Sequence, residues 1–184
     1  MAIVINGSGT VTGISVGGLP DGIVDDGTLA TDSVTAVKLA GGDNTPSFCV
    51  RVSEGNEYDV TQMTYFQMTY DTVEWDTDSA WASNTFTVPS GQGGKYLFST
   101  TSCIGMLDSG EQYTSLIRIN DGSKWDSFAR YMSTSSNEDA VLTSSYICEL
   151  SAGATVKAYM YHSHGSALQA TQKNRFSGCK LSGV

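Results

Sequence analysis

The sequence predicts an all-β protein, organised as a two-sheet jelly-roll head with an extended N-terminal segment. The chain of 184 residues contains 20 glycines and no long apolar stripe with the 3.6-residue period of a helix. Its clearest strand runs from Gly93 to Ile104, with aromatic and β-branched residues inside it and Gly105 as its expected end. Apolar side chains occur on both faces of this strand. This indicates a central strand, covered on each side by another sheet or another subunit.

Further strands are predicted from short runs of apolar and polar residues bounded by turn residues. Gln62–Trp75 is expected to supply one or two strands, and Asp121-Gly122 is expected to form a hairpin turn. The other expected strands are Phe48–Val52, Tyr113–Asn120, Trp125–Met132, Val141–Leu150, Thr155–His162 and Arg175–Leu181. This gives about eight to ten strands, which is enough for a jelly roll.

Residues 1–45 differ in composition and predict a segment separate from the head at residues 46–184. The segment is rich in Gly, Ser and Thr, and it cannot bury enough apolar area to fold alone. Within it, residues 21–30 are echoed by residues 31–40. The aligned apolar residues are Val24 with Val34 and Leu29 with Leu39. Such a stripe can be buried against copies of itself around a threefold axis, and the alternative is a disordered linker.

Several motifs follow one another in the head. They are Phe86–Pro89 with Gly94, Tyr96 and Phe98, then Ile117–Gly122, Leu150–Val156, and Phe176-Ser177-Gly178 with Leu181. This order resembles the globular head of the complement q-subcomponent, a member of the tumour necrosis factor-like superfamily, over roughly residues 46–184. Asp121 in place of Asn and Ala154 in place of Asp depart from the family pattern. The resemblance implies a tumour necrosis factor-like jelly roll, a fold that carries no catalytic role in this family.

The same resemblance implies a homotrimer, because the sheet with the first, third, sixth and last strands packs around a threefold axis in this superfamily. The implied trimer-interface candidates are Tyr96, Phe98, Tyr146 and Phe176, and the intrachain core is the favoured alternative for Phe98. Composition also indicates subunit contacts. The chain contains 9 tyrosines, 3 tryptophans and 6 phenylalanines. Together these aromatic side chains present more apolar surface than one small β-sandwich usually buries.

Two N-terminal motifs resemble sequences of tail-fibre and appendage proteins of tailed bacteriophages, notably those of marine bacteria and cyanobacteria. The motifs are Ile5–Ser15 and Val34-Thr35-x-x-Lys38-Leu39-Ala40. The resemblance implies a virion protein made in the host cytoplasm, a homotrimeric tail fibre or spike-like appendage whose head recognises a host surface glycan or protein. The anchor candidates toward other virion proteins are then Val24, Leu29, Val34 and Leu39. The alternative is a capsid fibre, decoration or adaptor protein that only bridges or stabilises other virion proteins.

Charge and hydropathy argue against two classes of partner. The net charge of -9 leaves no basic surface for a nucleic acid. No stretch approaches the roughly 18 apolar residues of a membrane span. Met1–Asn6 has neither the positive start nor the apolar length of an export signal. We therefore expect no nucleic-acid partner, no membrane insertion, and synthesis in a reducing cytoplasm.

The four cysteines form no zinc motif, because they are scattered singly without Cys-x-x-Cys spacing. They are Cys49, Cys103, Cys148 and Cys179. The resemblance places them on neighbouring strands of one sheet, where pairing is an alternative. Buried free thiols are the favoured interpretation for a protein of cytoplasmic origin.

Other polar clusters contain residue types that occur in metal or catalytic sites. His162-Ser163-His164 has a spacing that can ligate a metal, but histidines that face solvent or a receptor are favoured. Asp76–Asp78 and Glu138-Asp139 are calcium alternatives with incomplete ligand patterns, so solvated loops are favoured. The carboxylates at Glu54, Glu57 and Asp59 do not define a glycosidase pair. We expect no enzyme activity, no catalytic residue, no cofactor and no metal.

Overall fold

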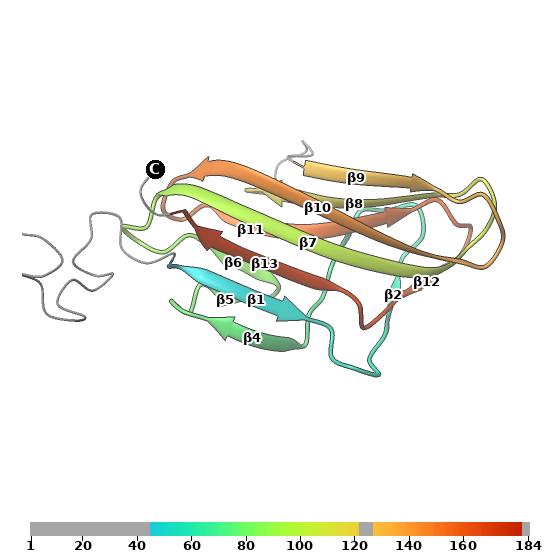
Figure 1. Ribbon diagram of the computed structural model, residues 1–184, viewed down its shortest axis with the longest axis horizontal. Coiled ribbons are helices and arrows are strands. Elements are labelled where there is room, and N and C mark those ends of the chain that lie inside the picture. Colours follow the sequence, from blue (N-terminus) through green and yellow to red (C-terminus); the bar gives the residue numbers. More distant parts are fainter. Residues whose placement is uncertain (1–44, 122–126, 182–184) are drawn as a thin grey trace, which may run out of the picture. The chain divides into compact units, whose positions relative to one another are not determined.

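The computed structural model describes residues 45–121 and 127–181, which form two antiparallel β-sheets (Figure 1). Its strands are β1 Ser47–Arg51, β2 Tyr58–Val60, β3 Phe66–Gln67, β4 Thr72–Asp76, β5 Trp81–Ala82, β6 Thr85–Thr87, β7 Gly94–Leu107, β8 Gln112–Ile119, β9 Ser127–Met132, β10 Glu138–Leu150, β11 Thr155–His162, β12 Leu168–Ala170 and β13 Arg175–Lys180. The predicted all-β, two-sheet architecture is confirmed. Short strands of two or three residues raise the count above the expected one. Across the described ranges, no helix is long and apolar enough to cross a membrane.

Two predicted features fall on residues whose structure is not described. The repeat residues Val24, Leu29, Val34 and Leu39 lie outside the described residues, as does the rest of residues 1–44. Gly122 of the predicted hairpin turn also lies outside them. The residues before it, Asn120 and Asp121, both have positive φ angles of 52° and 51°. Such angles suit the start of a tight hairpin turn.

Sheet A has the strand order β2-β12-β7-β13-β1-β4, and β10 pairs with β7. Sheet B has the order β5-β6-β11-β8-β9, and β3 pairs with β11. The longest ladder joins β7 to β10, from the pair Gly94 and Leu150 to the pair Leu107 and Glu138. The four cysteines lie on β1, β7, β10 and β13, which are neighbours in sheet A. This agrees with the placement that the family resemblance implied.

The central strand β7 is longer than predicted, because Gly105 does not end it. The strand continues to Leu107. A Cβ atom at residue 105 would lie 2.8 Å from Oδ1 of Asp139. The register of the β7–β10 ladder also shifts between Glu138 and Ala140. Gly105 therefore marks a close approach within the sheet, a second use of glycine in strands besides ending them.

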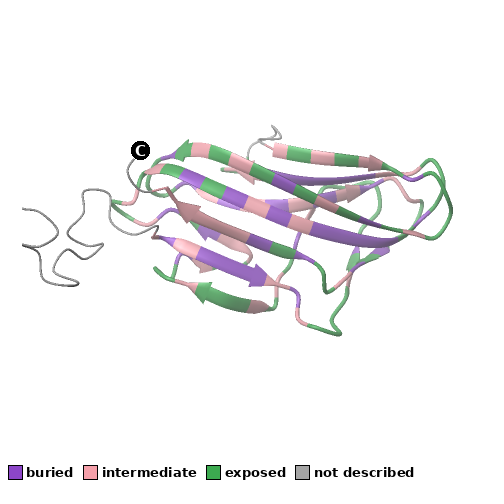
Figure 2. Ribbon diagram, viewed as in Figure 1, coloured by how far each residue is buried: buried purple, intermediate pink, exposed green. Residues whose placement is uncertain are grey.

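The hydrophobic core lies between the two sheets, and buried residues alternate with more exposed ones along β7 (Figure 2). At its centre, the rings of Phe48, Phe86, Phe98 and Phe176 contact one another. A Cβ atom at residue 178 would lie 2.4 Å from Cδ1 of Phe98. Glycine at this position lets the Phe98 ring pack directly on β13. The Phe-Ser-Gly motif therefore has a packing role.

The described head has two distinct ends. Ser47 at the start of β1 lies opposite Cys179 near the end of β13, and we call this the terminal end. β7 begins at the terminal end and runs to the opposite one, where Leu107 precedes the turn into β8 (Figure 1). The residues between β11 and β12 lie at that opposite end too, which we call the loop end.

Candidate functional site

Three of the four predicted interface residues belong to the core of a single chain. Tyr96, Phe98 and Phe176 have no exposed surface, and the Tyr96 hydroxyl donates a 2.6 Å hydrogen bond to the Gln92 carbonyl. Tyr146 is half-buried opposite Phe98 and packs against the same core. We therefore correct the interface prediction for the first three residues, because a side chain without exposed surface has nothing to offer a second chain. The core alternative for Phe98 is confirmed.

Four exposed apolar residues of sheet A lie on the face that points away from sheet B. Leu97 on β7 and Ile147 on β10 are register partners and are 36% and 60% exposed. Val141 on β10 is 52% exposed, and Trp75 on β4 is 50% exposed. We call the surface that carries these four residues the outer face of sheet A. Exposed apolar side chains gathered on one face are typical of a protein contact.

A groove with a volume of about 300 Å³ crosses the outer face of sheet A. Trp75 and Leu97 line it, together with the smaller residues Ser47, Ser99, Ser177, Gly178 and Cys179 and part of Phe48. The neighbouring hydroxyls pair with one another, as in the 3.0 Å hydrogen bond from Ser145 Oγ to Ser99 Oγ. Small, internally paired side chains let another protein surface approach closely without losing hydrogen bonds to water.

The cysteines on this sheet are free thiols, and Cys49 and Cys103 are buried as expected, whereas Cys148 and Cys179 are only partly buried. Cys49 donates a 3.3 Å hydrogen bond from Sγ to Glu74 Oε2. Burial, and next this hydrogen bond and the Glu74 charge, raise the pKa of Cys49 to about 11. Glu74 also forms a 2.9 Å ion pair with Arg51. Cys49 is therefore a protonated, weakly nucleophilic thiol at neutral pH.

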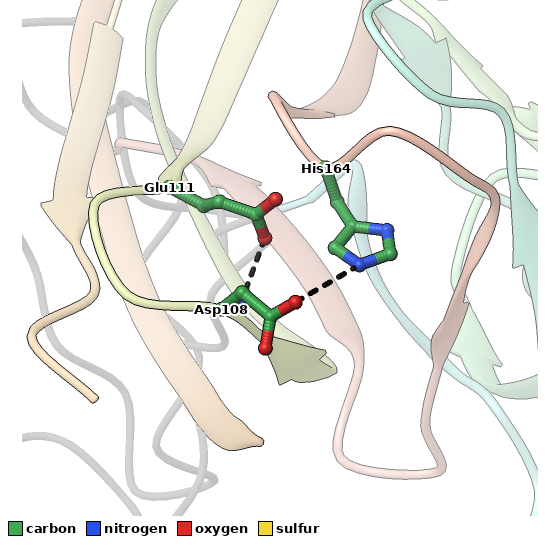
Figure 3. Close-up of side chains that lie close together, drawn as sticks. All are labelled: Asp108, Glu111 and His164. Carbon is green, nitrogen blue, oxygen red and sulfur yellow. Dashed lines mark hydrogen bonds and ion pairs between the residues drawn. The ribbon is translucent and has the colours of Figure 1, made fainter. Parts of the chain in front are cut away.

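Three side chains able to bind a metal meet at the loop end (Figure 3). Asp108 and Glu111 come from the β7–β8 turn, and His164 comes from the chain between β11 and β12. One ligand atom from each lies within 4.8 Å of the others. His164 Nε2 is 3.7 Å from Asp108 Oδ2, and Glu111 Oε2 accepts a 2.8 Å hydrogen bond from the Asp108 backbone N–H. The cluster was not predicted from the sequence, because strands distant in the chain supply its members.

His162 is not the solvent-facing residue that the sequence favoured. It ends β11, its side chain is completely buried, and Nε2 lies 3.0 Å from the Val60 carbonyl oxygen. Burial lowers the pKa of His162. Its Nδ1 has no hydrogen-bond partner within the described part of the chain. Buried His162 and partly exposed His164 therefore do not share a solvent-facing strand surface.

The two predicted calcium alternatives anchor turns through hydrogen bonds. Asp76 accepts hydrogen bonds from the backbone N–H groups of Ala80 and Trp81, at 2.9 and 3.0 Å. Glu138 accepts hydrogen bonds from the hydroxyls of Ser135, Tyr131 and Ser133. These hydrogen bonds, in that order of importance, lower the pKa of Glu138 to about 2. Both carboxylates thus fix local backbone geometry.

Comparison with known proteins supports the fold. No protein-family model matches the chain, and no curated protein matches it. Among solved structures, it is similar to the globular domain of the zebrafish complement 1qA protein, with a TM-score of 0.53 and 14% sequence identity. The similarity covers 74% of this chain and 98% of that one. It shows the fold alone, and the head is a jelly roll of the complement C1q and tumour necrosis factor-like type.

Proposed function

We propose that this protein is a homotrimeric display module whose heads associate through the outer face of sheet A. The observation that carries this proposal is the exposed apolar group of Trp75, Leu97, Val141 and Ile147 on one sheet face. Removing such surface from water favours association and opposes the entropy that the chains lose on assembly. The number three is inferred from the resemblance to the tumour necrosis factor-like superfamily, in which the corresponding sheet packs around a threefold axis.

The distribution of charge on this face favours a second copy of the chain as its partner. Each chain carries a net charge of -9, so copies repel one another unless the contact itself is nearly neutral. The centre of the face holds uncharged pairs such as Thr101 and Thr143, whose hydroxyl oxygens lie 3.2 Å apart. The nearby Glu74 carboxylate is balanced by Arg51 and Arg175. Identical chains can therefore meet here without burying like charges.

We also propose that the trimer is a phage virion appendage, attached through residues 1–45. This proposal is supported by the N-terminal sequence, which resembles phage fibre proteins, and by its repeat residues Val24, Leu29, Val34 and Leu39. The polarity of the head fits outward display, because β1 starts and β13 finishes at the terminal end and leave the loop end for contacts. Weak contacts to a host glycan or protein, repeated over three chains and many appendages, give avidity that one contact lacks.

Adsorption measurements test recognition against a purely structural role. Saturating full-length protein, added to host cells before the phage, is expected to bind the cells and reduce phage adsorption. Failure to bind cells, combined with reattachment to particles that lack the protein, would instead indicate the capsid fibre, decoration or adaptor role. Immunogold electron microscopy then locates the protein on tail or capsid. Its absence from purified virions would overturn the virion assignment.

A further inference from the structure

We propose that Asp108, Glu111 and His164 form a binding site for one transition-metal dication of the Zn²⁺ class at the loop end. Two separate parts of the chain converge there, the β7–β8 turn and the residues after β11 (Figure 3). The site lies away from the outer face of sheet A, and it does not depend on the proposed assembly or on the virion role.

The distances suit a site that closes around an ion. Ligand atoms around tetrahedral zinc, each about 2.0–2.2 Å from the metal, lie about 3.4 Å apart. Asp108 Oδ2 and His164 Nε2 are already 3.7 Å apart, and all three ligand atoms lie within 4.8 Å of one another. The Asp108 side chain is 54% exposed and can rotate by the small amount required. Closure therefore needs side-chain rotation and no change of the strands.

The ligand types decide the class of metal. Calcium and magnesium prefer oxygen ligands throughout, whereas an imidazole nitrogen beside carboxylates suits zinc and its neighbours in the first transition row. His164 Nδ1 lies 3.1 Å from the Ser166 carbonyl oxygen and accepts a 3.2 Å hydrogen bond from the Ser166 backbone N–H, so Ser166 holds the ring in place in either tautomer. Metal binding at Nε2 selects the tautomer with the proton on Nδ1, which then donates to the carbonyl oxygen and leaves the Nε2 lone pair on the side of Asp108. Hydrogen bonds of this kind orient histidine ligands in metal sites.

A second observation next to the cluster concerns a buried histidine. His162 is completely buried, and its ring centroid lies 6.4 Å from that of His164. Its Nδ1 has no hydrogen-bond partner among the described residues, and an unpaired buried nitrogen is unfavourable. A metal held by three protein ligands keeps a water at its open position. If that water lies within hydrogen-bond distance of His162 Nδ1, it gives the buried nitrogen a partner.

Metal titration of the tag-free, reduced, full-length protein tests the site. Calorimetry with Zn²⁺, and visible absorption with Co²⁺, are expected to show one bound ion per chain. His164→Asn keeps a side-chain amide near Ser166 but removes Nε2, and Glu111→Gln keeps an acceptor for the Asp108 N–H. Each variant is expected to weaken metal affinity at least about tenfold. Glu149→Gln alters an exposed carboxylate on β10 and serves as the matched control, with unchanged affinity.

Four results would overturn the site. They are no Zn²⁺ or Co²⁺ binding by the unaltered protein, unchanged affinity in both site variants, a sulfur-to-cobalt charge-transfer band that assigns the metal to the cysteines, or displacement of Zn²⁺ by an equal concentration of Ca²⁺. Circular dichroism without metal checks that each variant is folded. If one variant fails this check, the other variant and the stoichiometry of the unaltered protein still decide the outcome.

Discussion

Leu97 and Ile147 lie opposite one another on β7 and β10, and both side chains are exposed on the outer face of sheet A. Their neighbours on β7, Tyr96 and Phe98, are fully buried in the core. Because side chains alternate along a strand, one strand supplies both the core and an exposed apolar row. The core row is buried within one chain, whereas the outer row is exposed and is the surface that the proposed assembly would cover.

Cysteine reactivity should report whether the outer face is covered. Cys179 lies opposite Leu97 on β13 and lines the groove. Assembly is expected to slow alkylation of Cys179 at least about tenfold relative to an Ile147→Asp variant, because only transient opening then exposes it. Mass mapping of the alkylated peptides gives both rates. Cys49 serves as the control and should react slowly in both proteins, since its pKa is raised to about 11. Equal rates for Cys179 would mean that the face stays open.

The core assignment of Phe98 predicts a large loss of stability on truncation. Phe98→Ala should reduce the free energy of unfolding by about 3–5 kcal/mol, because it removes buried apolar area and leaves a cavity. Leu97→Ala, at the neighbouring position on the other face, should cost much less. Urea unfolding measures the loss for each of these two variants. Both variants also carry Ile147→Asp, so that assembly does not contribute to the free energy of unfolding. Similar losses at the two positions would contradict the assignment.

Gly178 should tolerate no side chain. Gly178→Ala places a Cβ atom 2.4 Å from Phe98 Cδ1 and 2.9 Å from Phe48 Cε1, so the core must shift. We expect a loss of about 1–3 kcal/mol in the free energy of unfolding, as for other overpacked cores. Gly165→Ala is the matched control, because nothing lies within 4 Å of its Cβ position. A neutral Gly178→Ala would show that the Phe-Ser-Gly motif is not required for packing.

The lowered pKa of the Glu138 carboxyl predicts a specific loss of stability in acid. Hydrogen bonds lower its pKa from 4.5 to about 2, so the folded state binds its proton less readily than the unfolded state does. Its contribution is therefore complete above about pH 5 and is lost as the pH falls toward 2. Glu138→Gln should lower the Tm at pH 7 and reduce the fall of Tm between pH 5 and 2. Glu149→Gln is the control; a Glu138→Gln curve that parallels that of the unaltered protein would count against this role.

Local patterns predicted the strands well where alternation and turn residues agree. β11 has the predicted bounds, Thr155 to His162, because its alternating residues end at a polar loop. Gly105 misled the prediction, since a glycine that allows a close approach and one that ends a strand look alike in sequence. Tyr96 and Phe98 were predicted at an interface but lie on the core face of β7, for a similar reason. Alternation separates two faces but does not say which one meets the second sheet.

The loop-end cluster illustrates what a single sequence does not contain. Asp108 and Glu111 form an ordinary acidic turn, and His164 follows a strand from the other sheet. The β8–β11 ladder, which ends with Tyr113 opposite His162, and the hydrogen bonds between Gln112 and Ser163 fix the β7–β8 turn beside the residues after β11. The cluster therefore depends on strand register, which no local motif encodes.

The most direct test of assembly through the outer face of sheet A is the mass of the protein in solution. Light scattering measures it for the full-length protein and for its Ile147→Asp variant, each at several concentrations. The unaltered protein is expected to have three times the chain mass of 19.5 kDa. The variant should have the mass of one chain, because each contact would bury a carboxylate without a partner, at a cost of about 3 kcal/mol or more. A single-chain mass for the unaltered protein, or a trimer that survives in the variant, would contradict it.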